Sequence, residues 1–214
     1  HGRELSEALP DDLENYDDEK LFAEVVLFVD WYMTGIFGKT FSDHVRSDFL
    51  NIWYKLLSKI SFDHETLVLR DFHADNLMWL PSREGIRKCG LLDYQDAVRG
   101  LPAYDLMSLL EDARRDLKPG MAGDLLDYYY TSLPKFDRSQ FNKVYAVLSA
   151  QRHCKVIGIF SRLAIRDRKY NYLAHIPRCW SLLERVCCFP ELKILDDWLN
   201  AHIPPQKRTS HSLQ

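Results

Sequence analysis

The fold of this chain is decided by the stretch Leu67-Val-Leu-Arg-Asp-Phe-His-Ala-Asp-Asn-Leu-Met-Trp-Leu80, which sets polar side chains between two apolar segments. The apolar segments predict two short strands, over residues 66–70 and 76–80. Polar groups next to buried strands are costly to desolvate unless they have hydrogen-bond partners or a chemical task. The stretch therefore predicts a functional loop carried by a small β element.

Three residues in and after this stretch have the spacing of a phosphoryl-transfer site. Residues 81–85 predict a turn and residues 88–93 a third strand, which ends at Asp93. Asp71 and Asn76 are five residues apart, and Asp93 follows seventeen residues later. Phosphoryl transfer needs a carboxylate that receives a proton from the attacking hydroxyl, together with oxygen ligands for Mg²⁺. The pattern therefore favours a kinase-type reaction.

The rest of the chain is predicted to be helical. Apolar residues recur at three- and four-residue spacing from Lys20 to Ile36 and again from Phe41 to Ile60. Further helices are expected over residues 104–117, 121–132, 138–165, 175–188 and 191–201. The predicted fold class is α+β and mostly α, with a small β insert that carries the catalytic loop.

Composition excludes several classes of protein. The 214 residues are 46% hydrophobic and 28% charged, which is typical of a globular chain with a sizeable core. A formal net charge of −3 provides no basic field for nucleic acid or a membrane surface. No apolar run reaches the ~20 residues of a membrane-spanning helix. The five cysteines lack C-x-x-C spacing, so we expect reduced thiols in a cytoplasmic protein rather than a zinc site.

The loop resembles the catalytic loop of protein kinases, which reads H-R-D-x-x-x-x-N and precedes a strand ending in D-F-G. The chain has Leu69-Arg-Asp-Phe-His-Ala-Asp-Asn76 and then Asp93-Tyr-Gln95, so leucine replaces the first histidine and glutamine the glycine. In both the glutamine at position 95 and the histidine at position 73, the loop resembles that of small-molecule kinases of the aminoglycoside phosphotransferase and choline kinase type. The stretch Ala97-Val-Arg-Gly-Leu-Pro-Ala-Tyr-Asp-Leu106 resembles the G-x-P-x-x-D-L of that superfamily. The resemblance implies a kinase-like carboxy-terminal lobe.

Within the superfamily the chain resembles bacterial anomeric sugar kinases, which phosphorylate N-acetylmuramate and N-acetylglucosamine at C1. The similarity extends over most of residues 20–180. It rests on the stretches Glu24–Tyr32, Leu69–Pro81, Gly158–Leu163, Arg166–Lys169 and Tyr172–Arg178. It implies ATP as the phosphoryl donor, Mg²⁺ as the metal and a small sugar or amino-alcohol as the acceptor, with a role in cell-wall recycling.

The resemblance implies a role for each residue of the predicted site. Asp71 is the catalytic base that receives the proton of the attacking hydroxyl. Asn76 supplies a neutral oxygen to Mg²⁺ and Asp93 a carboxylate, so both residues bind the metal and, through it, the nucleotide. His73 completes the catalytic set, where a hydrogen bond to the loop backbone and a contact with phosphate or substrate are equally consistent with its position.

The neighbouring charged residues are expected to have supporting roles. Asp75 is consistent with a solvated turn. Arg70 is expected to pair with an internal carboxylate, and Asp105 to hold the loop through backbone N–H groups. The pair Arg114–Arg115 is expected at a solvated helix end, with recognition of an anionic sugar as the alternative.

The resemblance also implies a division of the protein into lobes. Kinases of this type carry an amino-terminal lobe with a glycine-rich loop and a strand lysine, and nothing before residue 66 supplies either. We therefore expect residues 1–18 to be a linker after the inter-lobe hinge, residues 19–203 a carboxy-terminal lobe and residues 204–214 a loose tail. The amino-terminal nucleotide lobe is the expected partner, and the chain alone is expected to have weak or no activity.

Two alternatives keep the same residues but change the function. The acceptor is an aminoglycoside, a choline-like alcohol or homoserine in the first, and the chain is a non-catalytic binding module in the second. Acidic residues over the acceptor would favour a cationic substrate, whereas arginine or lysine would favour an anionic sugar such as N-acetylmuramate.

Overall fold

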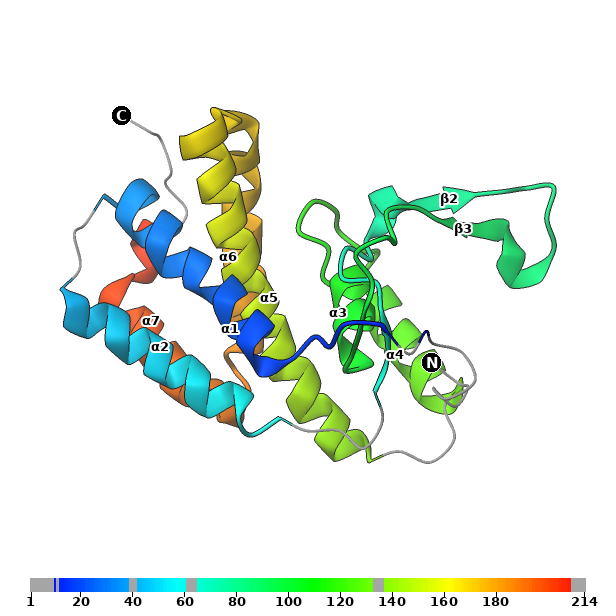
Figure 1. Ribbon diagram of the computed structural model, residues 1–214, viewed down its shortest axis with the longest axis horizontal. Coiled ribbons are helices and arrows are strands. Elements are labelled where there is room, and N and C mark those ends of the chain that lie inside the picture. Colours follow the sequence, from blue (N-terminus) through cyan, green and yellow to red (C-terminus); the bar gives the residue numbers. More distant parts are fainter. Residues whose placement is uncertain (1–9, 11, 39–41, 61–64, 133–136, 209–214) are drawn as a thin grey trace. The chain divides into compact units, whose positions relative to one another are not determined.

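The chain forms two compact units (Figure 1). The fold is that of a computed structural model, which describes residues 10, 12–38, 42–60, 65–132 and 137–208. We call residues 1–16 with 62–145 the loop unit, and residues 17–61 with 146–214 the helical unit. The expected linker and tail lie only partly within the described residues.

Four three-residue strands form two antiparallel ribbons in the loop unit. β1 (Thr66–Val68) pairs with β4 (Val98–Gly100), and β2 (Leu77–Trp79) pairs with β3 (Cys89–Leu91). The sequence predicted β1, β2 and β3 and missed β4. The described end of the expected linker runs beside β4, where Tyr16 N donates to Arg99 O at 2.7 Å and Arg99 N donates to Glu14 O at 2.8 Å.

Helices complete the loop unit. They are α3 (Ala103–Leu110), α4 (Met121–Ser132) and the first residues of α5 (Arg138–Asp167). The prediction of a helix over 104–117 was wrong at its end, because Glu111 leaves the helical region with φ −119° and ψ 46°. Asp112 Oδ1 then accepts a hydrogen bond from Arg114 N at 2.8 Å, a local bond that favours a turn over a further helical turn.

The helical unit is built around aromatic side chains. α1 (Asp18–Leu27) continues directly into a π-helix, η2 (Phe28–Ile36). α2 (Asp43–Leu57), the rest of α5, α6 (Ile176–Val186) and α7 (Lys193–His202) complete the unit. Phe28 stacks on Tyr32 and Phe49 with ring centroids 5.2 and 5.4 Å apart, and Trp180 Nε1 donates to the Tyr32 hydroxyl at 3.0 Å. Such pairs stabilise a core beyond their buried area.

Short 3₁₀ turns connect these elements: η3 (Ala74–Asn76), η4 (Gly85–Lys88), η5 (Tyr170–His175), η6 (Pro190–Leu192) and η7 (Pro205–Lys207). Within the described part of the expected tail, the buried guanidinium of Arg208 donates to Glu184 and Asn200 at 2.7 Å each. The rest of the expected tail lies outside the described residues. The predicted α+β, mostly α fold class is confirmed.

No helix among the described residues is long and apolar enough to cross a membrane.

Candidate active site

A buried carboxylate on α3 holds the start of the predicted loop. Asp105 accepts hydrogen bonds from Leu69 N at 2.7 Å and from Arg70 N at 3.1 Å, one on each carboxylate oxygen. Only 4% of Asp105 is exposed, so these two charge-assisted bonds offset part of the cost of burying its charge. They also fix Arg70, whose φ of 65° is unusual for a residue other than glycine. The predicted role of Asp105 is confirmed.

The loop then closes on itself through a short turn. His73 N donates to Asp71 O at 3.1 Å and Asn76 N donates to His73 O at 3.0 Å, which forms η3. Asn76 Nδ2 donates to the Asp71 carbonyl at 2.8 Å and lies 3.5 Å from His73 Nε2. Three of the predicted residues are thereby brought together within one turn. Because Nδ2 faces the loop, Oδ1 is the atom that Asn76 offers as an acceptor elsewhere.

The β2–β3 ribbon brings the fourth predicted residue to the same place. Leu77 pairs with Leu91, and the ladder extends one step further because Leu92 N donates to Asn76 O at 2.9 Å. Asp93 follows directly, in a left-handed conformation with φ 56°. Gln95 Nε2 donates to Asp93 Oδ1 at 2.6 Å, so the glutamine that replaces glycine in the motif orients this carboxylate. Asp71 and Asp93 are both exposed, so both carboxylates are accessible to a ligand.

The segment after α3 holds the middle of the loop. Asp112 Oδ2 accepts a hydrogen bond from Ala74 N at 3.4 Å, and Arg115 forms an ion pair with Asp75. Sequence reasoning missed the contact between Asp112 and the loop, because a helix over 104–117 gave no indication that this side chain reaches the loop. The signal available was a pair of carboxylates, at 111 and 112, directly after an apolar helix. Asp75, interpreted from the sequence as a solvated turn residue, is paired.

Arg70 directly precedes Asp71, and its side chain stabilises the start of the loop. Its guanidinium lies over the ring of Tyr16, 5.4 Å from the centroid, which is a cation–π contact. Tyr16 also packs edge-on against Tyr104 of α3 at 4.9 Å. Gly100 makes this arrangement possible, because a Cβ there would lie 3.1 Å from Tyr16 Cβ and 3.2 Å from Val68 Cγ2.

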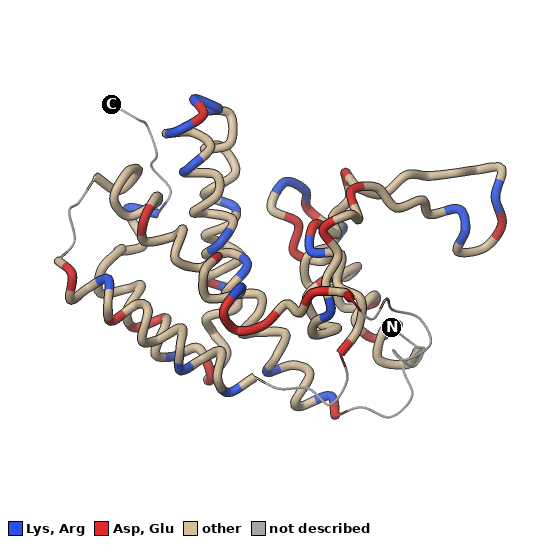
Figure 2. The backbone as a smooth tube through the Cα atoms, viewed as in Figure 1, with Lys and Arg blue, Asp and Glu red and all other residues tan. Residues whose placement is uncertain are grey.

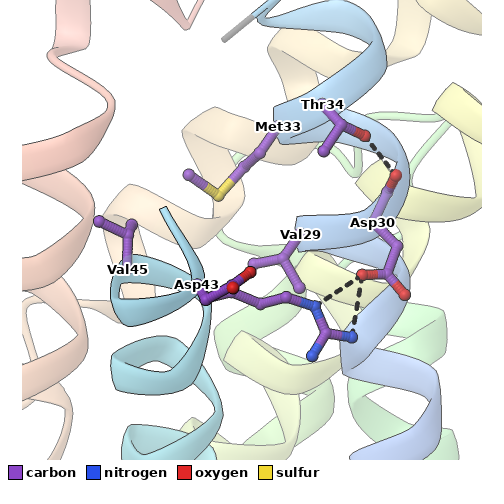
Figure 3. Close-up of a pocket in the computed structure, with 7 residues that line it drawn as sticks. Val29, Asp30, Met33, Thr34, Asp43 and Val45 are labelled. Carbon is purple, nitrogen blue, oxygen red and sulfur yellow. Dashed lines mark hydrogen bonds and ion pairs between the residues drawn. The ribbon is translucent and has the colours of Figure 1, made fainter. Parts of the chain in front are cut away.

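A separate pocket lies in the helical unit, between η2 and α2 (Figure 3). Its volume is about 60 Å³, and its lining residues are Val29, Asp30, Met33, Thr34, Asp43, Val45 and Arg46. Arg46 forms an ion pair with Asp30 at 3.1 Å, and Figure 3 marks the contacts to Asp30 with dashed lines. The pairing involves two of the three charged residues that line this pocket, the third being Asp43, and the pocket has room for no more than a water molecule or two.

The phosphotransferase enzyme family matches residues 3–141, which is more than half of the chain and includes the whole loop. The chain belongs to this phosphotransferase family. The predicted relationship to kinases of the aminoglycoside phosphotransferase type is confirmed.

Several relatives share a single name. An N-acetylmuramate/N-acetylglucosamine kinase of Caulobacter vibrioides is 37% identical over 193 residues, which cover 90% of this chain and 53% of that protein. The proteins of that name from Pseudomonas putida and Neisseria meningitidis are 34% and 35% identical, and each match covers 81% of this chain and 52% of the relative. The chain therefore spans about half the length of the curated relatives it matches.

The residues present suit the metal that such phosphotransferases use. Within the described ranges, no three or more His, Cys, Asp and Glu side chains gather to hold a metal ion. Mg²⁺ does not require such a cage, because it keeps several waters and takes one or two protein oxygens together with substrate phosphates. The Oδ1 atom of Asn76 and the carboxylate of Asp93, at the same end of the β2–β3 ribbon, could supply two such oxygens.

Apolar side chains are exposed along this ribbon and beyond it. Trp79 is 69% exposed and Ile86 94%, and Met78, Leu91, Leu92 and Tyr94 are exposed as well. Lys88 Nζ lies 5.7 Å from the centre of the Trp79 ring. A run of exposed apolar side chains beside a polar site marks a surface suited to cover by a ligand or by another part of a protein.

Proposed function

We propose that the protein is an ATP-dependent kinase that phosphorylates the anomeric hydroxyl of N-acetylmuramate and N-acetylglucosamine. Membership of the phosphotransferase family and the shared name of the relatives support this assignment. The observation that carries it is the arrangement of the loop, in which Asn76 donates to the Asp71 carbonyl and continues the ladder that leads to Asp93.

Asp71 is the proposed catalytic base. Its carboxylate is exposed, while its backbone is fixed by hydrogen bonds through Asp71 N to Leu69 O at 2.8 Å and through Asp71 O to Asn76. The carboxylate accepts a hydrogen bond from the sugar hydroxyl and takes its proton as the sugar oxygen bonds to the γ-phosphorus of ATP and the bond from that phosphorus to the bridging oxygen breaks, which releases ADP. Little other covalent chemistry falls to the protein, so a rigid base in an accessible position is the main requirement.

Asn76 and Asp93 are the proposed Mg²⁺ ligands, and through the metal they bind ATP. When bound, Mg²⁺ neutralises charge on the phosphates of the nucleotide. Gln95 keeps Asp93 in position through its bond to Oδ1. His73 is proposed to orient the Asn76 amide, whose Nδ2 lies 3.5 Å from His73 Nε2.

We further propose that residues 19–203 act as a carboxy-terminal lobe, preceded by a linker over 1–18 and followed by the 204–214 tail. The curated relatives extend over about as many residues again as this chain matches. A nucleotide lobe that corresponds to this further part of the relatives is the proposed partner of the exposed Trp79 and Tyr94. On this proposal the chain alone has weak or no activity. Acting on N-acetylmuramate, the kinase would serve cell-wall recycling in the cytoplasm, where ATP is available.

A mass-spectrometric assay tests the proposal. The protein from its complete reading frame, and the 214-residue chain, are each incubated with ATP, Mg²⁺ and a panel of N-acetyl sugars, choline and an aminoglycoside. We expect a sugar 1-phosphate from the complete protein and its loss in an Asp71→Asn variant. A phosphorylated choline or aminoglycoside in place of the sugar would change the acceptor, and no product from the complete protein would favour the binding-module alternative.

A further inference from the structure

We propose that Arg115 binds the carboxylate of the anionic acceptor and so determines how well N-acetylmuramate is used relative to N-acetylglucosamine. The inference rests on the proposed function, because it assigns a residue to the acceptor side of the same site. The two sugars differ in the lactyl ether of N-acetylmuramate, which carries a carboxylate, so a site that accepts both must tolerate a negative charge and its absence.

The loop by itself would repel an anionic sugar. Asp71, Asp75, Asp93 and Asp96 are all exposed in the loop or just after the β2–β3 ribbon. Figure 2 colours Asp and Glu red and Lys and Arg blue, and both colours occur in the loop unit. Like charges at short range raise the free energy of bringing a further anion into a site. A cation held at the loop, in addition to the Mg²⁺ proposed at Asn76 and Asp93, would lower this cost for N-acetylmuramate.

Arg115 is a cation that is held directly at the loop. Its guanidinium is paired with Asp75, which lies in the same turn as His73 and directly before Asn76. The side chain of Arg115 is 62% exposed, so an acceptor at the loop can reach it. Arg70 is less suitable, because its guanidinium lies over the Tyr16 ring, and Lys88 is engaged with Trp79 on the ribbon.

The pairing with Asp75 explains tolerance of both sugars. With the neutral sugar, Asp75 balances the charge of Arg115 and no cation is left uncompensated. With the anionic sugar, the planar guanidinium has donors for a second carboxylate, and arginine binds carboxylates in this two-pronged manner. A lysine could supply the charge and could not supply the fork.

Kinetics of the protein from its complete reading frame test the assignment. In Arg115→Gln we expect kcat/KM for N-acetylmuramate to fall roughly ten- to a hundred-fold, mainly through KM, which is the value of a hydrogen bond to a charged group. For N-acetylglucosamine, kcat/KM is expected to stay within about twofold of the original value, because that sugar has no carboxylate that depends on Arg115. Arg115→Lys should be intermediate.

Asp75→Asn is the decisive companion variant, because it breaks the same ion pair from the other side. It keeps the cation and removes its competitor, so the preference for N-acetylmuramate should be kept or increased. Lys118→Gln removes an exposed cation from the same segment and should leave the preference unchanged. If Arg115 only braced the loop through Asp75, Arg115→Gln and Asp75→Asn would impair both sugars alike, and that result would overturn the assignment. Absence of sugar phosphate from the unchanged protein would instead overturn the proposed function, and this assignment with it.

Discussion

The two units of the chain are stabilised in different ways. The loop unit has strands of only three residues and holds its functional turn through charged side chains that accept or donate bonds to the loop, such as Asp105, Asp112 and Arg115. The helical unit has a closely packed aromatic core, in which Phe28 contacts Tyr32, Phe49 and Trp180. The difference separates two tasks. Packing supplies stability, and directional hydrogen bonds supply the geometry that chemistry needs. Substitutions in the two units should therefore affect different measurements.

The largest effect is expected from Asp71→Asn. Because Asp71 is exposed and its backbone bonds are unaffected by the change, the free energy of unfolding should stay within about 0.5 kcal/mol of the original. Loss of the proton acceptor should reduce kcat by a factor of about 10² to 10⁴. The two quantities are measured by denaturant unfolding and by the sugar kinase assay on the complete protein. A large loss of stability would mean that Asp71 is a structural residue, which would contradict the view that the loop supplies geometry for the reaction while packing supplies stability.

Asp105→Ala tests whether hydrogen bonds alone hold the loop. The substitution leaves the partly buried amides of Leu69 and Arg70 without their acceptor, and each orphaned donor costs about 1–3 kcal/mol. Both stability and activity should therefore fall, and hydrogen exchange at these two amides should become fast. Asp105→Asn keeps an acceptor oxygen and should show a smaller effect. Unchanged exchange at Leu69 and Arg70 in the alanine variant would contradict the role given to Asp105.

The sequence allowed the first part of this site to be predicted and not the second. Asp71, Asn76 and Asp93 follow a linear pattern, and Asp105 lies in a motif of fixed spacing, so their placement needed only three strands and a helix. The contacts of Asp112 and Arg115 depend on where α3 ends. That end is set by a local turn which competes with helix by a small free energy, and the periodicity of apolar residues does not report it. β4 was missed because three residues, Val98–Gly100, carry too little pattern.

A glycine in each unit tests the difference in packing. In the helical unit, a Cβ on Gly158 of α5 would lie 2.4 Å from the backbone carbonyl carbon of Leu27, so Gly158→Ala should destabilise by about 1–3 kcal/mol through overpacking. In the loop unit, Gly123 of α4 has nothing within 4 Å of such a Cβ, and Gly123→Ala should stabilise by about 0.5–1 kcal/mol. Denaturant unfolding of both variants gives the two signs. Stabilisation by both substitutions would mean that helix propensity, and not close approach, governs both positions.

The smallest effect concerns the ionisation of buried thiols in the helical unit. Burial raises the pKa of the Cys187 thiol from 9.0 to about 12, with Asp196 adding to the rise and Arg208 opposing it. A raised folded-state pKa gives stability that is complete below pH 9 and is lost as pH rises from about 9 toward 12, because only the unfolded chain releases the proton there. The loss is at most about 1.4 kcal/mol per pH unit.

Tyrosines and lysines also ionise in this range, so the comparison must be between variants. Cys187→Ala should lower stability at pH 8 and flatten its decline between pH 8 and pH 10 by about 1 kcal/mol, since the linked proton is gone. The adjacent Cys188 is exposed, and Cys188→Ala is the matched control variant. Equal slopes in the two variants would mean that Cys187 is not held neutral by the packing of the helical unit.

The exposed Cys89 of the β2–β3 ribbon should react with a thiol reagent at pH 8, while the buried Cys187 reacts only on unfolding. This result would distinguish the two units by chemistry rather than by stability.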